Sequence, residues 1–186
     1  MRLTNLSRIG ANDDGTTPIQ VPHSLDLYGA KIDTLPERLC VQGDLDLTFS
    51  AIIRLPEYLR VEGDLLLDET RILYLPTGLW VSGNLDLRRT AVIALGDDTR
   101  VDGYLDLEGR PIMRIPPRLV VGGNLYAGRT RIRAFPEDCY VGGQIHGVSR
   151  AVKNTYRRAR SSAERKRVRA IFKYPEASRR QLTLDI

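Results

Sequence analysis

The chain has 186 residues, 42% of them hydrophobic, which is typical of one folded domain and excludes a disordered chain. It contains no run of eighteen apolar residues, and no apolar stretch follows the basic residues near its start, so the sequence predicts neither a membrane-spanning helix nor a secretory signal peptide. The net charge of +5 is unevenly distributed, because residues 150–173 carry ten Lys or Arg and one Glu, whereas residues 1–149 are acidic overall.

Residues 1–18 form the first segment of the chain, and they are polar. Turn-forming residues cluster at positions 12–18 without a hydrophobic period, which is typical of irregular structure. We expect a loose arm there, or a cap over the regular element that begins at about residue 19.

Residues 19–148 are organised by a repeat with a constant step of twenty residues. Six full copies follow one another without insertions and begin at Ser24, Asp44, Asp64, Asn84, Tyr104 and Asn124. A constant period of this kind is typical of a solenoid, in which each copy forms one coil and buries its apolar side chains only against the neighbouring coils. The sequence therefore predicts one elongated, mainly β domain.

Each copy contains two short stretches with the alternation of a β-strand. In the first copy, Leu25 and Leu27 flank Asp26, so we expect both leucines to point inward and the aspartate to point to solvent. The alternation of Leu39 and Val41 predicts a second strand further along the coil. A proline between the two strands excludes a helix there, and the glycine that recurs near the end of each copy is interpreted as the residue that allows the turn into the next strand.

The pattern LDLxxTxIxxLPxxLxVxG resembles the leucine-rich repeat, in the short twenty-residue form found in bacterial leucine-rich proteins, including secreted effectors. The resemblance covers about two-thirds of the chain. It implies that the LxL stretches form a concave parallel sheet, with a right-handed parallel β-helix as the alternative fold. No copy has the asparagine of the family, whose position falls at Ala30, Ser50, Thr70, Thr90, Arg110 and Thr130.

The period stops at Ser149, and residues 149–175 have a helical pattern. Val152, Tyr156, Ala159 and Ala163 fall on one narrow stripe surrounded by basic residues, and Pro175 ends the pattern. We expect a basic helical cap on the solenoid, formed by one helix or by two, followed by a tail at residues 176–186.

The resemblance implies that outward side chains of the concave sheet bind a partner, most often a protein. The residues predicted for this role are Asp26, Asp46, Asp86, Asp106, Tyr104, Tyr126, Asp68, Arg88 and Glu108. Carboxylates on neighbouring coils stand about 5 Å apart and repel one another, which favours a cation nearby. Two interpretations stay open, a docking face for a basic segment and a solvated acidic face without a partner.

Two further columns of side chains are predicted on the surface. Arg60, Trp80 and Arg100 occupy successive coils, where the guanidinium groups are expected to stack on the indole as a structural contact. A four-coil apolar stripe is formed by Ile53, Leu73, Ile93 and Met113. It is either an exposed interface or, as the sequence favours, a set of side chains packed beneath a loop or in a wide core.

The basic segment offers an alternative function, because its cations are suited to neutralising phosphates of a nucleic acid without reading its sequence. The candidate residues are Lys153, Arg157, Arg158, Arg160, Arg165, Lys166, Arg167 and Arg169. The competing interpretation is that the segment only caps the solenoid and its charges are solvated.

Enzymatic chemistry has little support in the sequence. His23 and His146 lie at opposite ends of the repeat region, and no His, Cys and Asp residues have the spacing of a metal site or a catalytic triad. We expect no catalysis, no cofactor and no metal. Cys40 and Cys139 are five coils apart, too far for a disulfide, so we expect a cytoplasmic protein, with delivery into a host cell as a bacterial effector as the alternative.

Overall fold

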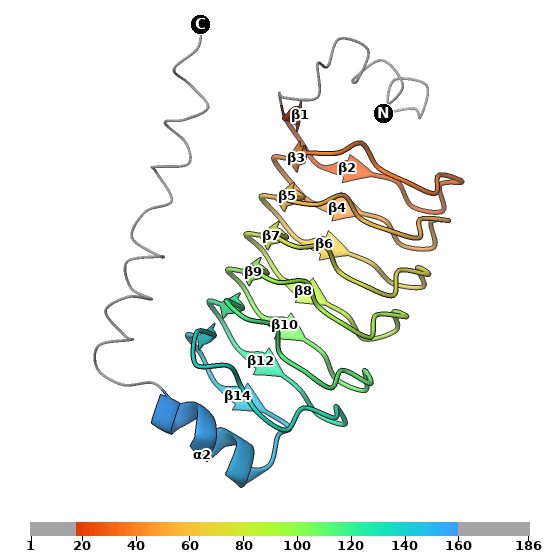
Figure 1. Ribbon diagram of the computed structural model, residues 1–186. Helices are drawn as coiled ribbons and strands as arrows, with labels where there is room; N and C mark the ends of the chain where they lie inside the picture. Colours follow the sequence, from red (N-terminus) through yellow and green to blue (C-terminus); the bar gives the residue numbers. More distant parts are fainter. Residues whose placement is uncertain (1–17, 160–186) are drawn as a thin grey trace, which may run out of the picture.

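The computed structural model describes residues 18–159 and shows a mainly β parallel solenoid of about six turns, with very little helix. The coils are stacked one on another along the length of the molecule (Figure 1). The predicted arm, apart from Pro18, and residues 160–186 lie outside the described residues. The prediction of a β-solenoid with a twenty-residue step is confirmed.

Two seven-stranded parallel sheets run the length of the stack. The odd-numbered sheet contains β1 (Ile19–Val21), β3 (Leu39–Val41), β5 (Arg60–Val61), β7 (Trp80–Val81), β9 (Arg100–Val101), β11 (Val120–Val121) and β13 (Tyr140–Val141). The even-numbered sheet contains β2 (Leu25–Asp26), β4 (Leu45–Asp46), β6 (Leu65–Leu66), β8 (Leu85–Asp86), β10 (Leu105–Asp106), β12 (Leu125–Tyr126) and β14 (Ile145–His146). Each residue pairs with the residue twenty positions later, so both predicted strands of the coil are confirmed.

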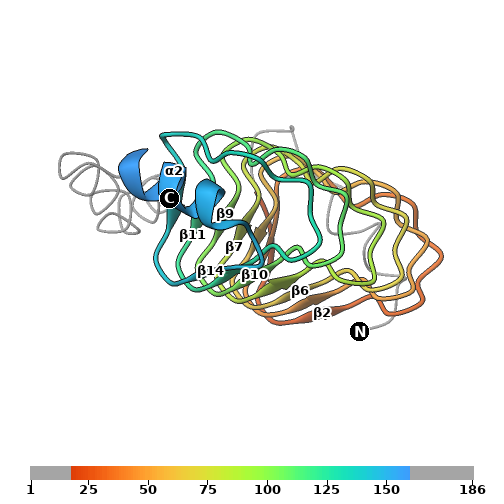
Figure 2. The ribbon, with the colours of Figure 1, turned by 90° about the horizontal axis from the view of Figure 1, so that it is seen from below.

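The segment after each even-numbered strand forms a third side of the coil without named strands. Its backbone is still bonded from coil to coil, for example from Ala51 N to Ala30 O at 2.9 Å and from Ile93 N to Leu73 O at 2.9 Å. Tyr74 and Ala94 form an isolated parallel bridge on this side. Viewed from one end, the coils superpose around a common interior (Figure 2).

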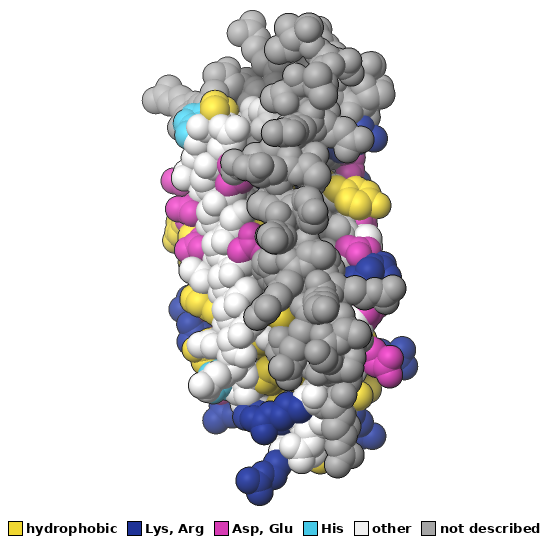
Figure 3. All heavy atoms as spheres, turned by 90° about the vertical axis from the view of Figure 1, so that its left-hand side faces the viewer, with side chains coloured by type: hydrophobic (Ala, Val, Ile, Leu, Met, Phe, Trp, Pro, Cys, Tyr) yellow, Lys and Arg dark blue, Asp and Glu magenta, His cyan; other side chains and the backbone are white. Residues whose placement is uncertain are grey.

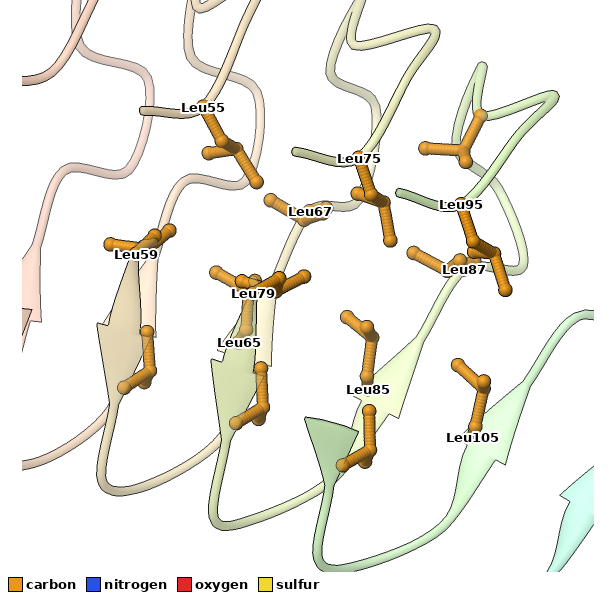
Figure 4. Close-up of a cluster of buried hydrophobic side chains, with 14 of the residues drawn as sticks. Leu55, Leu59, Leu65, Leu67, Leu75, Leu79, Leu85, Leu87, Leu95 and Leu105 are labelled. Atoms are coloured by element: carbon orange, nitrogen blue, oxygen red, sulfur yellow. The ribbon is translucent and has the colours of Figure 1, made fainter. Parts of the chain in front are cut away.

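The interior is filled by columns of aliphatic side chains, one from each coil (Figure 4). Leu45, Leu65, Leu85 and Leu105 form one such column and are fully buried. Burying a side chain of this size contributes about 1.5–3 kcal/mol, and no coil can bury its leucines without a neighbour above or below. Cys139 is buried in a column of leucines, and neither Cys40 nor Cys139 forms a disulfide.

Threonine hydroxyl groups hold three of the turns that follow the even-numbered strands, at the position where the leucine-rich repeat has asparagine. The Oγ1 atoms of Thr70, Thr90 and Thr130 donate to the carbonyl oxygen three residues earlier at 2.7–2.8 Å. Each of these threonine hydroxyl groups therefore donates to a backbone carbonyl oxygen in a turn that lacks the asparagine of the leucine-rich repeat.

The recurrent glycines have a different role from the predicted one. Gly43, Gly63, Gly83, Gly103, Gly123 and Gly143 do not have positive φ angles, whereas Arg38, Phe49, Tyr58, Asp98 and Arg118 do. The glycines lie where successive coils approach each other. Gly83 N donates to Gly63 O at 2.9 Å, and a Cβ atom on Gly83 would lie 2.6 Å from the carbonyl carbon of Gly63. The glycines do lie in the bend between the two strands, as predicted, but the feature that requires glycine is the close approach of two backbones rather than a positive φ angle.

The helix α2 (Arg150–Ala159) packs against the last coil. The side chains of Val152 and Tyr156 are buried, and the Tyr156 ring lies 5.2 Å from the ring of Phe135. The Tyr156 hydroxyl accepts from Val141 N at 2.7 Å and donates to Val141 O at 3.2 Å, so it satisfies the exposed side of the last odd-numbered strand. The contact of α2 with the last coil involves residues 150–159, and the rest of the predicted cap, including the question of a second helix, lies outside the described residues.

The role of the glycines predicts that Gly83→Ala destabilises the protein by about 2–4 kcal/mol, because two packed backbones have to separate. Gly109→Ala is the matched control, since an added Cβ there meets nothing within 4 Å and only the strain of φ +75° remains, about 1–2 kcal/mol. Urea denaturation followed by circular dichroism measures both. Equal stability of Gly83→Ala and the unmodified protein would contradict the packing role.

Candidate functional site

The residues predicted to bind a partner lie on the outward face of the even-numbered sheet. Asp26, Asp46, Asp86 and Asp106 occupy equivalent positions in β2, β4, β8 and β10, with Asp26 directly opposite Asp46 and Asp86 opposite Asp106. Asp26 is exposed and Asp46 and Asp86 are half-buried, but Asp106 is only 7% exposed. The expectation that all of these aspartates point freely to solvent is therefore wrong for Asp106.

The aspartates of this column also hold the turn that follows the strand. The Oδ1 atom of Asp26 accepts from Tyr28 N at 2.9 Å, and Asp46 Oδ1 accepts from Thr48 N at 2.9 Å. Asp86 and Asp106 make the same bond to the backbone N–H two residues later, at 2.8 Å. Aspartate recurs here because its short side chain can reach this N–H, a role that sequence reasoning missed although the Asp-to-turn spacing signals it.

A second polar column on this side joins the coils. The side-chain oxygens of Ser24, Asp44, Asp64, Asn84 and Asn124 each accept from the backbone N–H of the residue twenty positions later, at 2.6–3.0 Å. Each of these residues has an oxygen acceptor on a short side chain, and Tyr104 lacks one. This column is structural and satisfies backbone donors along the edge of the sheet.

Arg88 joins two carboxylates from neighbouring coils. Its Nη2 atom lies 2.6 Å from Asp86 Oδ2, and its Nε atom lies 3.4 Å from Asp106 Oδ2. Burial acts to raise the pKa of Asp86, but the hydrogen bonds and charge of Arg88 outweigh it, so this pKa lies below its ordinary value. Burial raises the pKa of Asp106, and the neighbouring Asp86 charge adds to this effect against the opposing hydrogen bond from Glu108 N and the charge of Arg88.

Aromatic side chains occupy the same face near the carboxyl end of the stack. The rings of Tyr104 and Tyr126 meet edge to face at 6.2 Å, and Tyr126 stacks on His146 at 4.9 Å with an angle of 13° between the rings. Burial, followed by the charges of Asp86 and Asp64, raises the pKa of Tyr104, which therefore stays neutral at pH 7. The even-numbered sheet thus presents an acidic part that adjoins an aromatic part.

The remaining predicted residues of this face flank the Asp column. Asp68 is half-buried and lies 3.5 Å from Arg89 Nε, and Glu108 is exposed. Leu66 takes the place of an aspartate in the column and is 41% exposed. The structure brings all nine predicted residues to one surface, with the acidic ones in two groups separated by Leu66.

The Arg60–Trp80–Arg100 column lies on the odd-numbered sheet, as predicted. The guanidinium carbon of Arg60 is 3.7 Å from the indole centroid and that of Arg100 is 5.1 Å away. Trp80 Nε1 donates to Asp102 Oδ2 at 3.2 Å, and Arg100 Nε lies 2.7 Å from Asp102 Oδ1. The distances from the two guanidinium groups to the indole confirm the stacked arrangement. Asp102 holds both the indole of Trp80 and the guanidinium group of Arg100.

The apolar stripe on the third side is exposed. Ile53 is 55% exposed, Leu73 45%, Ile93 38% and Met113 61%. The prediction that these side chains pack beneath a loop or in a wide core is wrong, because the residue before each of them fills the interior and the next side chain points outward.

Most of the candidate nucleic-acid residues cannot be placed on a surface. Lys153 and Arg157 belong to α2, where Arg157 is exposed and Lys153 half-buried. The side chain of Arg158 and residues Arg160, Arg165, Lys166, Arg167 and Arg169 lie outside the described part of the chain. Figure 3 shows Lys and Arg side chains gathered near the end of the molecule that carries α2.

The turn role of the aspartates predicts a difference between two substitutions. Asp46→Asn keeps an oxygen that accepts from Thr48 N and should leave stability nearly unchanged, whereas Asp46→Ala should cost about 0.5–2 kcal/mol. Thermal denaturation of the two variants measures this difference. Equal loss in both variants would show that the charge, rather than the hydrogen bond, stabilises the turn.

The opposite pKa shifts predict that Asp106 takes up its proton at a higher pH than Asp86 as the pH falls from 7. The lowered pKa means that ionised Asp86 contributes stability at neutral pH, which is lost as the pH falls through the folded-state pKa. The raised pKa means that stability increases as Asp106 becomes protonated. Carboxyl-detected NMR titration measures the order, and Arg88→Gln should raise the pKa of Asp86 whereas Arg114→Gln should not. A pKa of Asp86 above that of Asp106 would contradict this assignment.

Among residues 18–159, no group of three or more His, Cys, Asp or Glu side chains is arranged to hold a metal ion. No helix in that same range is long and apolar enough to cross a membrane. Comparisons of the chain with protein-family models, with curated proteins and with solved structures found no match.

Proposed function

We propose that the chain is a non-catalytic, leucine-rich-repeat-like scaffold that binds a basic segment of a partner protein along the outward face of the even-numbered sheet. The observation that carries the proposal is the continuous surface on which Asp26, Asp46, Asp86 and Asp106 adjoin the stacked rings of Tyr126 and His146. The LxL strands and the turn hydroxyls support the likeness to leucine-rich repeats, whereas the odd-numbered sheet is an addition to that pattern.

The acidic side chains are held in place before a partner arrives. Because Asp26 and Asp46 each bond a backbone N–H through Oδ1, their carboxylates have fixed directions, and little side-chain entropy is lost on binding. A carboxylate has about four acceptor positions, so one bond to the turn leaves the others for Lys or Arg of a ligand. The net charge of +5 disfavours a general attraction of cationic peptides to the whole chain, so binding has to be local.

The aromatic part adds a preference for arginine and aromatic residues in the ligand. A guanidinium group can stack on the face of a tyrosine ring, such as that of Tyr104 or Tyr126, while a neighbouring lysine meets the aspartates. Arg88 is an internal competitor, because it already occupies Asp86 and adjoins Asp106. Its removal frees two carboxylates for the ligand, which sets Arg88 apart from the other residues of the face.

The two other functions suggested by the sequence stay predictions. Nucleic-acid binding through the basic segment concerns residues that lie mostly outside the described ones. Delivery into a host cell rests on the resemblance to bacterial leucine-rich effectors and on the polar composition of the first seventeen residues. We therefore propose neither of them as the main function.

The test is calorimetric titration of the full chain with a synthetic peptide of alternating Lys and Tyr. The deciding variant combines Asp26→Asn, Asp46→Asn, Asp86→Asn and Asp106→Asn, because asparagine keeps the oxygen that holds each turn while the charge is removed. Loss of a charge contact worth about 0.2–1 kcal/mol at each of these four positions predicts binding weaker by at least about fourfold. Affinity of the unmodified chain should fall as salt is added.

Two control variants accompany this titration. Arg88→Gln should bind the peptide more tightly, and Arg54→Gln, on the third side, should bind it as the unmodified chain does. Unchanged affinity in a folded fourfold variant would exclude the acidic face as the binding surface.

A further inference from the structure

The third side of the coil carries aliphatic side chains that the core does not require. In each of four successive coils, a fully buried residue at Ile52, Ile72, Val92 or Ile112 is followed by an outward aliphatic residue. These are Ile53, Leu73, Ile93 and Met113, and Tyr74 beside them is 62% exposed. A contiguous exposed apolar surface of this kind marks an interaction site more often than a random surface does.

Basic side chains surround this stripe. Exposed cations of the adjoining positions are Lys31, Arg54, Arg71, Arg114, Arg131 and Arg133. The stripe and these cations occupy the positions of residues 31, 33 and 34 and their equivalents in the following coils. Asp33 is the one acidic residue at these positions of the described coils. No ion pair within residues 18–159 involves any of the six cations, in contrast to Arg60, Arg88, Arg100 and Arg118, which all have carboxylate partners.

The backbone of this side has few groups to offer a ligand. Ile53 N donates to Asp33 O at 3.2 Å, Leu75 N to Ala94 O at 3.1 Å, and Arg131 N to Ile112 O at 2.9 Å. The small residues Ala51 and Ala91 lie two positions before Ile53 and Ile93 of the stripe. The aliphatic face, defined as residues 31, 33 and 34 and their equivalents in the next five coils, thus combines apolar side chains with uncompensated positive charge.

We propose that the aliphatic face docks onto an anionic lipid surface. The aliphatic side chains would enter the boundary between headgroups and acyl chains, while the arginines on both sides of the stripe contact lipid phosphates. Tyr74 has the ring and hydroxyl that suit this boundary. The charge complementarity with anionic lipid is direct, whereas a second copy of this face would bring like charges together, and a nucleic acid would leave the aliphatic side chains without apolar contacts.

Docking of the aliphatic face onto a lipid surface is compatible with the proposed binding of a basic protein segment to the even-numbered sheet. The acidic even-numbered sheet is a different side of the coil and would be repelled by anionic lipid. Lipid docking and peptide binding therefore use separate residues and can fail independently.

The test is flotation of the full chain with vesicles of phosphatidylcholine alone and of phosphatidylcholine mixed with phosphatidylglycerol. Binding should require phosphatidylglycerol and decrease with added salt. Residues 150–173 carry ten cations and would attract such vesicles by themselves, so the deciding variant combines Ile53→Ser with Ile93→Ser and leaves every charge in place. We expect binding at least tenfold weaker in this variant.

Matched variants define the other outcomes. Tyr58→Ser removes a still more exposed hydrophobic side chain that lies outside the face, and this variant should bind as the unmodified chain does. Arg54→Gln with Arg114→Gln should weaken binding to the anionic vesicles. Equal vesicle binding by the double-serine variant and the unmodified chain would overturn the proposal. So would a dimer of the unmodified chain that the double-serine substitution dissociates. Binding of an oligoglutamate peptide by the unmodified chain, without any binding to vesicles, would also overturn it.

Discussion

Burial of each coil's aliphatic side chains against the next coil is the interaction on which the whole structure depends. The strands have only two or three residues, too few to be stable by themselves, and the leucine columns are continuous through every described coil. Tight stacking explains why glycine recurs where two backbones meet. The left-handed backbone of Tyr58 and of Arg118 costs about 1–2 kcal/mol at each position, and burial of the adjoining Leu59 and Leu119 offsets this cost.

A constant register copies every outward residue into a column, so the three sides of the coil have separate chemical characters. The even-numbered sheet is acidic and aromatic, the odd-numbered sheet carries the Arg60–Trp80–Arg100 stack, and the third side is aliphatic and basic. Part of the acidic surface has a structural cause, because its oxygens satisfy backbone N–H groups in turns and between coils. Ligand binding by this surface therefore depends on the carboxylate oxygens and aromatic rings of the even-numbered sheet that these structural bonds do not use.

The twenty-residue repeat predicts the fold, both strands of the coil, the leucine columns and the stack of Arg60, Trp80 and Arg100. Each of these features follows from placing residues twenty positions apart next to one another. The role of Gly83 and the bonds of Asp44 and Asp64 depend on contacts between coils, which no single copy of the repeat contains. The exposure of Ile53 and Leu73 depends on the shape of the coil, which the sequence does not give. Each of them follows a buried isoleucine, and such a pair of adjacent aliphatic residues fits a wide core as well as a surface stripe. The environment of Asp106 depends on Arg88, which belongs to the preceding coil.

The central claim is that equivalent residues of successive coils stand one strand spacing apart along one rigid stack. The most direct measurement is the electron paramagnetic resonance distance between spin labels at Lys31→Cys and Arg131→Cys, two exposed positions five repeats apart, with Cys40 and Cys139 replaced by alanine. Five spacings of about 4.8 Å predict a narrow distribution near about 24 Å, widened only by the label linkers. A broad distribution, or a mean far from this value, would contradict the stacked solenoid and the surfaces derived from it.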